Sequence, residues 1–441
     1  MSAFTRHVAA SLALVFGLSA SMATASQVRL DVSMAKPTLL AKKKQTTHVK
    51  IGLTGFKMEN GGNRTPVNVS FVLDKSGSMT GDKIAKAKEA AVAAIQRLTK
   101  RDIVSVVVYD STVRVIVPAT KLTDRQMVCD SIRRIEAGGT TALFAGVSKG
   151  ADELRKFLDK NHVNRVVLLS DGLANVGPQS PSELGNLGAS LMKEGISVST
   201  MGLGLDYNED LMSQLAARSS GNHIFIEKAS DLVKIFNCEF DDVLSVVAQE
   251  VAIDIQVEPG VRPVRVLNMD AEINGQRVIV KMNQLYSQQE KYVLLEVEVP
   301  ATRAGKTLDV AEVKISYSNM QTKTTDRLSS AVSVNFTDSV AEVEEKTNLV
   351  VLEACVLQIA NGQNQLATVL RDKGDIEGAK RILIANGKYL AENGKVLDSK
   401  LLQLRYIDNV YQAKNLEGTE WLKTRKQMRR LQFADSVQQS Y

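Results

Sequence analysis

The sequence predicts an α/β fold in which a doubly wound domain is inserted in a β-sandwich and followed by a helical region. Three observations lead to this prediction. Between residues 67 and 236, runs of branched apolar residues alternate with helix-like segments. Short alternating runs flank this block at 27–66 and 248–336, and the residues after 340 have helical patterns. Regular strand–helix alternation specifies a largely parallel sheet, whereas short consecutive strands specify an antiparallel sandwich.

The central block begins with a buried strand, Val67–Leu73, and a helix, Asp82–Leu98, whose apolar residues recur on one face. Arg165–Leu169 has no polar alternation, which is typical of a parallel strand buried on both faces. The other predicted strands are Ile103–Tyr109 with Val113–Val117 as its hairpin partner, Ile196–Gly202 and His223–Glu227. The other predicted helices are Thr123–Ile135 with Thr123 as N-cap, Leu143–Leu158, Pro181–Glu194, Asn208–Ala217 and Ser230–Val247.

Two separate stretches of the chain are predicted to form one sandwich. Residues 26–66 supply its first strands, and residues 248–339 complete it with runs at Val251–Val257, Arg277–Lys281, Tyr292–Val299 and Glu312–Tyr317. The economical interpretation is that an α/β domain at 67–247 interrupts this sandwich. The C-terminal region, 340–441, is predicted to hold helices at Thr347–Asn361, Gln363–Asp372, Ile376–Asn393 and Asp398–Leu416.

Residues 1–25 have the order of a secretory signal peptide. Arg6 and His7 precede an uncharged run, Val8–Phe16, and small residues end in an Ala-x-Ala pattern at Ala25. This order predicts cleavage after Ala25 and a periplasmic or secreted protein. The alternative is an uncleaved membrane anchor, but Ser, Gly and Thr dilute the run, and a spanning helix needs about 20 mostly apolar residues.

Composition excludes several classes of function. The net charge of +6 over 441 residues is a mild excess, and the basic residues are spread out, so nucleic-acid binding is not expected. The four histidines have no helical ligand spacing, which argues against a zinc protease. Cys129, Cys238 and Cys355 fit no metal-binding spacing and are expected to be buried small side chains. Their odd number in an exported protein implies at least one unpaired thiol or an intermolecular bond.

Three segments carry oxygen ligands at the ends of predicted strands or the start of a helix. Asp74, Ser76 and Ser78 lie on the turn after the first strand, Gly138–Leu143 opens a helix with two threonines, and Asp171 follows another buried strand. Carboxylates and hydroxyls are the ligands of hard cations. A lone turn rich in Ser and Asp before a helix is usually an N-cap, but the two further segments favour a metal site.

These three motifs resemble, in order and placement, the metal-ion-dependent adhesion site (MIDAS) of von Willebrand factor type A (VWA) domains. The resemblance covers about 67–236 and implies a Rossmann-like fold and a single divalent cation, with Mg²⁺ expected first and Mn²⁺ or Ca²⁺ as alternatives. Thr141 competes for the threonine position, although the family pattern favours the residue directly after Gly-Gly. The implied ligands are Asp74, Ser76, Ser78, Thr140 and Asp171.

The wider chain is similar to bacterial secreted members of this family, akin to inter-alpha-trypsin inhibitor heavy chains and calcium-activated chloride channel proteins. Segments 175–178 and 202–212 are part of that likeness. Some relatives of the channel-named group carry a His-Glu-x-x-His protease motif, which this sequence lacks. Their protease activity is therefore not expected here.

The predicted site favours recognition over catalysis. Asp74 and Asp171 supply two negative charges, and the remaining ligands are neutral, so a bound divalent ion keeps room for one more oxygen. A carboxylate on a partner protein is the natural additional ligand. A structural scaffold of an envelope assembly, with the VWA domain as a spacer, is the main alternative. An enzymatic role, as a hydrolase or in metal insertion, is disfavoured because no base or nucleophile adjoins the motifs.

Overall fold

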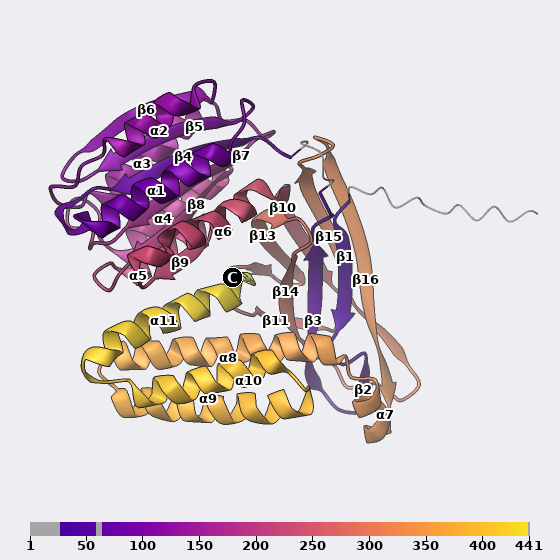
Figure 1. Ribbon diagram of the computed structural model, residues 1–441. Coiled ribbons are helices and arrows are strands. Elements are labelled where there is room, and N and C mark those ends of the chain that lie inside the picture. Colours follow the sequence, from indigo (N-terminus) through magenta and orange to yellow (C-terminus); the bar gives the residue numbers. More distant parts are fainter. Residues whose placement is uncertain (1–26, 59–63, 440–441) are drawn as a thin grey trace, which may run out of the picture.

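The computed structural model describes residues 27–58 and 64–439. The predicted signal peptide, residues 1–25, lies outside this range. Figure 1 shows an α/β domain, a β-sandwich and a bundle of helices side by side. Among the helices described, none has both the length and the apolar character needed to cross a membrane.

The α/β domain has a sheet whose strand order is β6-β5-β4-β7-β8-β9. All neighbouring pairs are parallel except β5 and β6. The chain leaves β4 toward β5 and later returns to β7 on the other side of β4, which makes a topological switch point between β4 and β7. The strands are β4 (Val67–Asp74), β5 (Ile103–Tyr109), β6 (Val113–Lys121), β7 (Val163–Ser170), β8 (Ile196–Leu203) and β9 (His223–Ile226). The predicted α/β fold is confirmed.

Helices cover both faces of this sheet. One face packs against α1 (Asp82–Arg97), α2 (Arg125–Arg133) and α6 (Leu232–Leu244). The other face packs against α3 (Leu143–Arg155), α4 (Pro181–Lys193) and α5 (Glu209–Arg218). All strand positions from β4, β5, β7, β8 and β9 are buried, as expected for a sheet covered on both sides.

Two helix ends differ from the prediction. Asp124, rather than Thr123, caps α2, and its side chain accepts a hydrogen bond from the Met127 amide. The helix predicted to reach Val247 ends at Leu244, because β10 (Val246–Val257) begins two residues later. Apolar residues at 246–247 fit a helix pattern and a buried strand equally well, so periodicity did not separate the two.

The sandwich contains strands from both sides of the α/β domain. In the first sheet, β3 (Gln45–Thr54) lies between β1 (Arg29–Met34) and β14 (Glu290–Val299), and β11 (Arg262–Val266) follows. The second sheet has the order β12-β13-β10-β15-β16-β2, in which β2 (Thr38–Leu40) pairs in parallel with β16 (Thr325–Thr337). Its other strands are β12 (Glu272–Asn274), β13 (Arg277–Tyr286) and β15 (Thr307–Asn319).

A chain that begins at Val67 is expected to lose its sandwich fold. β3 would be missing from the middle of its sheet, and its inward Val49, Ile51 and Leu53 side chains, which are fully buried, would be missing from the core. Each buried aliphatic side chain of this kind stabilises by about 1.5–3 kcal/mol. Thermal unfolding of this shortened chain and of a chain beginning at Gln27 makes the comparison. Equal melting temperatures would contradict the shared sandwich.

The C-terminal region consists of helices α7 (Val340–Glu345), α8 (Leu349–Asp372), α9 (Ile376–Val396), α10 (Lys400–Lys414) and α11 (Gly418–Val437). Two helices predicted on either side of Gly362 form the single helix α8. Isolated glycines weaken a helix without ending it, and here tertiary packing keeps the helix continuous. The predicted helical character of this region is confirmed.

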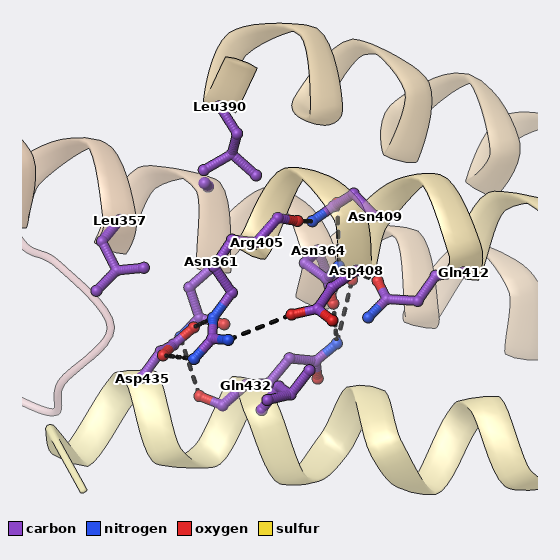
Figure 2. Close-up of a pocket in the computed structure, with 12 residues that line it drawn as sticks. Leu357, Asn361, Asn364, Leu390, Arg405, Asp408, Asn409, Gln412, Gln432 and Asp435 are labelled. Carbon is purple, nitrogen blue, oxygen red and sulfur yellow. Dashed lines mark hydrogen bonds and ion pairs between the residues drawn. The ribbon is translucent and has the colours of Figure 1, made fainter. Parts of the chain in front are cut away.

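A small pocket among α8, α9, α10 and α11 is lined mainly by polar side chains, which Figure 2 shows pointing toward one another. Asn364 donates to Gln412 at 2.6 Å, Gln432 donates to Asn364 at 2.7 Å, and Arg405 pairs with Asp435 at 2.7 Å. These groups satisfy one another, as buried polar groups usually do. We therefore interpret the pocket as part of the polar core of the helical bundle.

Helix α11 also packs against the α/β domain, and in Figure 1 it lies between that domain and α8. The buried Lys426 ammonium donates to the Tyr207 carbonyl at 2.7 Å and to Glu209 at 2.5 Å. Arg425 pairs with Asp210 at 2.5 Å. A charged contact of this kind fixes orientation, because each buried charge needs its partner in place.

Mild acid is expected to destabilise the contact between α11 and the α/β domain. His223 is buried, its ring meets the Phe433 ring at 5.8 Å, and its Nδ1 lies 2.9 Å from the Thr200 hydroxyl. Burial, aided by Lys426 and opposed by Asp210, lowers the pKa of His223 to about 3. The unfolded chain takes up a proton near its ordinary pKa of 6.5, whereas the folded chain does not.

Stability should therefore fall as the pH drops from about 6.5 toward 3, by up to about 1.4 kcal/mol per pH unit from this group. Urea unfolding of the wild type and of His223→Gln between pH 7.5 and 5 measures it. The variant should lose less stability over that interval. Parallel losses in both proteins would remove His223 as the cause.

Candidate metal site

The predicted ligands lie at the switch point of the sheet. β4 ends at Asp74, and its parallel neighbour β7 ends one residue before Asp171. The opposite ends of these strands face the sandwich, where Arg165 near the start of β7 donates to Tyr286 of β13 at 3.2 Å. Asp74 and Asp171 therefore lie together at the end of the sheet that points away from the sandwich.

Backbone hydrogen bonds tie the loops at this end together. The Lys75 amide donates to the Tyr109 carbonyl at 2.9 Å, and the Gly138 amide donates to the Lys75 carbonyl at 2.6 Å. The Gly77 amide donates to the Gly139 carbonyl at 2.9 Å. The turn after β4 is thus held against both the β5 end and the Gly-Gly loop, which preorganises the side chains it carries.

Four of the predicted side chains form one hydrogen-bonded cluster. The Ser78 hydroxyl donates to Asp171 Oδ1 at 2.7 Å, and the Ser76 and Ser78 hydroxyl oxygens lie 3.1 Å apart. Asp74 accepts from the Ser76 amide at 2.8 Å and from the Ser170 hydroxyl at 2.6 Å. Both carboxylates are fully buried, whereas Ser78 is exposed, so the cluster opens to solvent at Ser78.

The environment of Asp74 opposes its charge. Burial raises the pKa of the Asp74 carboxyl, and hydrogen bonds from Ser170 and Ser76 partly offset that rise. The nearby Asp171 raises the pKa of Asp74 slightly further. A carboxylate in this position gains from a nearby positive charge more than an exposed one does.

The structure separates the two candidate threonines. Thr140 is exposed, and its hydroxyl donates to the Ser111 hydroxyl at 2.9 Å, away from the cluster. Thr141 is buried, and a methyl group added at Gly172 would lie 3.3 Å from the Thr141 hydroxyl and 3.4 Å from the Ser78 hydroxyl. Thr141, which the sequence left as the competing candidate, is therefore the threonine that the fold brings beside Ser78.

Lys83 is a site residue that the sequence analysis did not identify. It lies in the first turn of α1, and its ammonium pairs with Asp171 Oδ2 at 2.5 Å. With Lys83 counted, the two carboxylates and one ammonium leave a net charge of −1 rather than −2. The sequence carried no signal for this contact, because Asp171 lies 88 residues further along the chain and only the fold brings it to Lys83.

The donor set fits a hard divalent cation. In the described part of the chain no three His, Cys, Asp or Glu side chains gather as a metal cluster. The candidate site instead offers two carboxylates, from Asp74 and Asp171, and hydroxyls from Ser76, Ser78 and Thr141. Oxygen donors of this mixture suit Mg²⁺, Mn²⁺ or Ca²⁺ and do not suit zinc or copper.

A largely parallel sheet with helices on both faces and an Asp-x-Ser-x-Ser turn at its switch point defines the class of VWA domains. A family profile described as von Willebrand factor type A domain matches residues 68–237. Residues 68–237 of this chain therefore form a VWA domain. Such domains commonly mediate protein–protein interaction and are generally not catalytic.

Particular relatives and one solved structure are similar to this chain over different shares of its length. An uncharacterized protein of Synechocystis, sll0103, is 26% identical over 74% of this chain and 79% of its own length. The human inter-alpha-trypsin inhibitor heavy chain H2 is 30% identical over 39% of this chain, which spans only 20% of that protein. A solved structure, von Willebrand factor type A from Catenulispora acidiphila, has a TM-score of 0.70 at 17% identity and covers 85% of this chain and 89% of its own. That last likeness concerns the fold alone.

Proposed function

We propose that the VWA domain holds one divalent cation and uses it to bind an acidic side chain of a partner protein. The observation that carries this proposal is the cluster at the switch point. There, two buried carboxylates lie beside serine hydroxyls, and Ser78 of this cluster is exposed to solvent. We assign the ion to Asp74, Ser76, Ser78, Thr141 and Asp171. Thr141 replaces Thr140 in this set because its hydroxyl lies on the side of Ser78.

The charges in the site favour a ligand that brings a carboxylate. A divalent ion would be only partly neutralised by the Asp74–Asp171 pair, and Lys83 adds a further positive charge beside Asp171. When bound, the ion supplies Lewis acidity toward an incoming oxygen atom. By linkage, a carboxylate ligand and the ion must raise each other's affinity by the same factor.

Binding rather than catalysis is supported by what surrounds the hydroxyls. Ser76 and Ser78 contact each other and Asp171, and their described contacts include no imidazole that could act as a base. The competing proposal is a structural scaffold, which the buried contact of α11 with the α/β domain would also suit. The two proposals differ in their dependence on the cation.

Affinity capture with the full chain separates them. Envelope extract is passed over immobilised wild type and Asp74→Asn, each in Mg²⁺ and in EDTA. A partner retained only by the wild type in Mg²⁺ supports the adhesion-type function. Partners retained equally in all four conditions support the scaffold and contradict a cation-dependent role.

We propose export to the periplasm or the cell exterior from residues 1–25 alone. The grounds are their charged start, their apolar run and their Ala-x-Ala pattern. The expected result of N-terminal sequencing of the envelope fraction is a chain beginning at Ser26. A chain retaining Arg6 and recovered in the membrane pellet would overturn this proposal.

A further inference from the structure

Three aliphatic side chains beside the candidate metal site are exposed to solvent. The exposed fractions are 58% for Leu173, 40% for Val176 and 41% for Leu205. Exposed apolar residues scattered singly on a surface carry no information, but a group at a binding site does. We call these three residues the apolar rim.

The connections of the rim place it at the site. Leu173 follows Gly172, where an added methyl group would lie 3.3 Å from the Thr141 hydroxyl and 3.4 Å from the Ser78 hydroxyl. Val176 follows Asn175, which exchanges two hydrogen bonds with the backbone of Thr141, at 2.8 and 3.1 Å. Leu173 and Val176 are thus held on the loop after β7, directly next to the proposed ligands.

Leu205 approaches from the neighbouring strand. It follows Gly204, where an added methyl group would lie 3.8 Å from the Lys83 ammonium, and that ammonium contacts Asp171. β7 and β8 are parallel neighbours with Ser170 opposite Gly202, so the loops that follow them lie side by side. The rim therefore borders one side of the cluster, along the ends of β7 and β8.

The side chains of the apolar rim do not pack into the core of the domain. Ala174 packs against the core under α3–α5, and Leu203 and Tyr207 are buried on either side of Leu205. These inward residues anchor the two loops, whereas Leu173 and Leu205 alternate outward. Surface aliphatic groups that contribute nothing to the core are free to contact a ligand.

The other side of the cluster has a different chemistry. Thr80, Gly81, Gly139 and Thr140, in the loops after β4 and before α3, are exposed, small and uncharged, and the exposed Asp82 follows Gly81. On the rim side, Asp206 is exposed next to Leu205 and would repel a second acidic group of a ligand. The surface thus combines the proposed cation with an aliphatic border and with exposed carboxylates at Asp206 and Asp82.

We propose that the partner presents a single carboxylate flanked by apolar side chains, which pack on the apolar rim. This inference rests on the proposed function. The carboxylate would complete the coordination of the cation, and the neighbouring apolar groups would supply specificity. When the partner buries Leu173 or Leu205, each of which is about half exposed, its affinity should rise about five- to tenfold per leucine. A partner rich in acidic residues without apolar neighbours fits this surface less well, because of Asp206.

Peptide selection on the full chain tests the proposal. A random 12-residue phage library is bound in Mn²⁺ and eluted with EDTA, and a selected peptide is then titrated against the wild type, Leu173→Ser/Leu205→Ser and Leu366→Ser/Leu404→Ser. The last pair removes exposed leucines from α8 and α10 and is the matched control. Calorimetric Mn²⁺ titration of all three proteins reports the metal site separately.

The expected peptides carry one Asp or Glu with apolar neighbours. The rim variant should bind them about 25- to 100-fold more weakly while binding Mn²⁺ normally, and the control should match the wild type. Selected peptides that lack apolar neighbours, equal affinity for the rim variant, or no eluted peptides despite normal Mn²⁺ binding would overturn the apolar rim. Absence of Mn²⁺ binding by the wild type would instead overturn the proposed function.

Discussion

Replacing Asp74 with asparagine is expected to abolish divalent-cation binding at physiological concentrations. Asn keeps the shape of the side chain and removes one of the two negative charges that would hold the ion. Loss of groups that merely orient metal ligands costs about 10–100-fold in affinity, so loss of a direct ligand should cost at least that much. Calorimetric Mn²⁺ titration measures the effect, and partner capture should be lost with it.

The fold of Asp74→Asn should survive, which makes the result interpretable. The Asp74 carboxyl is fully buried and accepts from the Ser76 amide and the Ser170 hydroxyl, so alanine would leave two buried donors unpaired at about 1–3 kcal/mol each. Asparagine retains an acceptor there. Its melting temperature should be close to that of the wild type.

Asp110→Asn is the matched control, because Asp110 lies at the same end of the sheet but pairs with Lys75 rather than with the cluster. Its Mn²⁺ affinity should equal that of the wild type. Normal Mn²⁺ binding by Asp74→Asn, or an equal loss in both variants, would remove Asp74 from the site.

Replacing Arg165 with methionine is expected to cost about 3–5 kcal/mol of unfolding free energy, the largest stability effect of any single change considered. Arg165 is fully buried between the α/β domain and the sandwich, and pairs with the buried Glu239 at 2.9 Å. It also donates to Gln284 and Tyr286 of β13. Without the guanidinium, the buried Glu239 carboxylate loses the positive charge that pairs with it at 2.9 Å.

Urea unfolding of Arg165→Met, of Arg165→Met/Glu239→Leu and of Arg277→Met measures this effect. The double variant should recover much of the loss, since removing both charges removes the uncompensated one. The exposed pair of Arg277 with Asp254 should contribute little by comparison, because solvent screens the two charges. A loss in Arg165→Met no larger than the loss in Arg277→Met would contradict the buried pair as the link between the α/β domain and the sandwich.

Much of this architecture follows from local patterns in the sequence. The strand Ile103–Tyr109 was predicted with the same bounds that the structure has, because seven consecutive buried positions leave little ambiguity. The start of α4 at Pro181 was predicted too, where Ser180 and Glu183 form a capping box. Insertion of the α/β domain in the sandwich followed from alternation on both of its sides.

Other features depended on contacts between distant segments. Thr140 and Thr141 are adjacent and chemically identical, and only the folded loop places one hydroxyl at Ser111 and the other beside Ser78. In the sequence, Lys83 looks like an ordinary charged residue on a solvated helix. Only in the folded domain does the end of β7 place Asp171 beside it. Lys426 likewise reads as one of several basic residues, yet it is buried against Tyr207 and Glu209 from the α/β domain. Such pairings are set by tertiary packing, which sequence periodicity does not report.

We propose above that one divalent ion lies between Asp74 and Asp171 at the switch point of the VWA domain. Anomalous diffraction from crystals grown with Mn²⁺ tests it most directly. We expect one strong peak within about 2.0–2.6 Å of oxygen atoms from these two carboxylates, the Ser76 and Ser78 hydroxyls or bridging waters, on the side of Thr141 rather than Thr140. A fully loaded crystal with no peak at this position, or with its peak at other side chains, would contradict the claim.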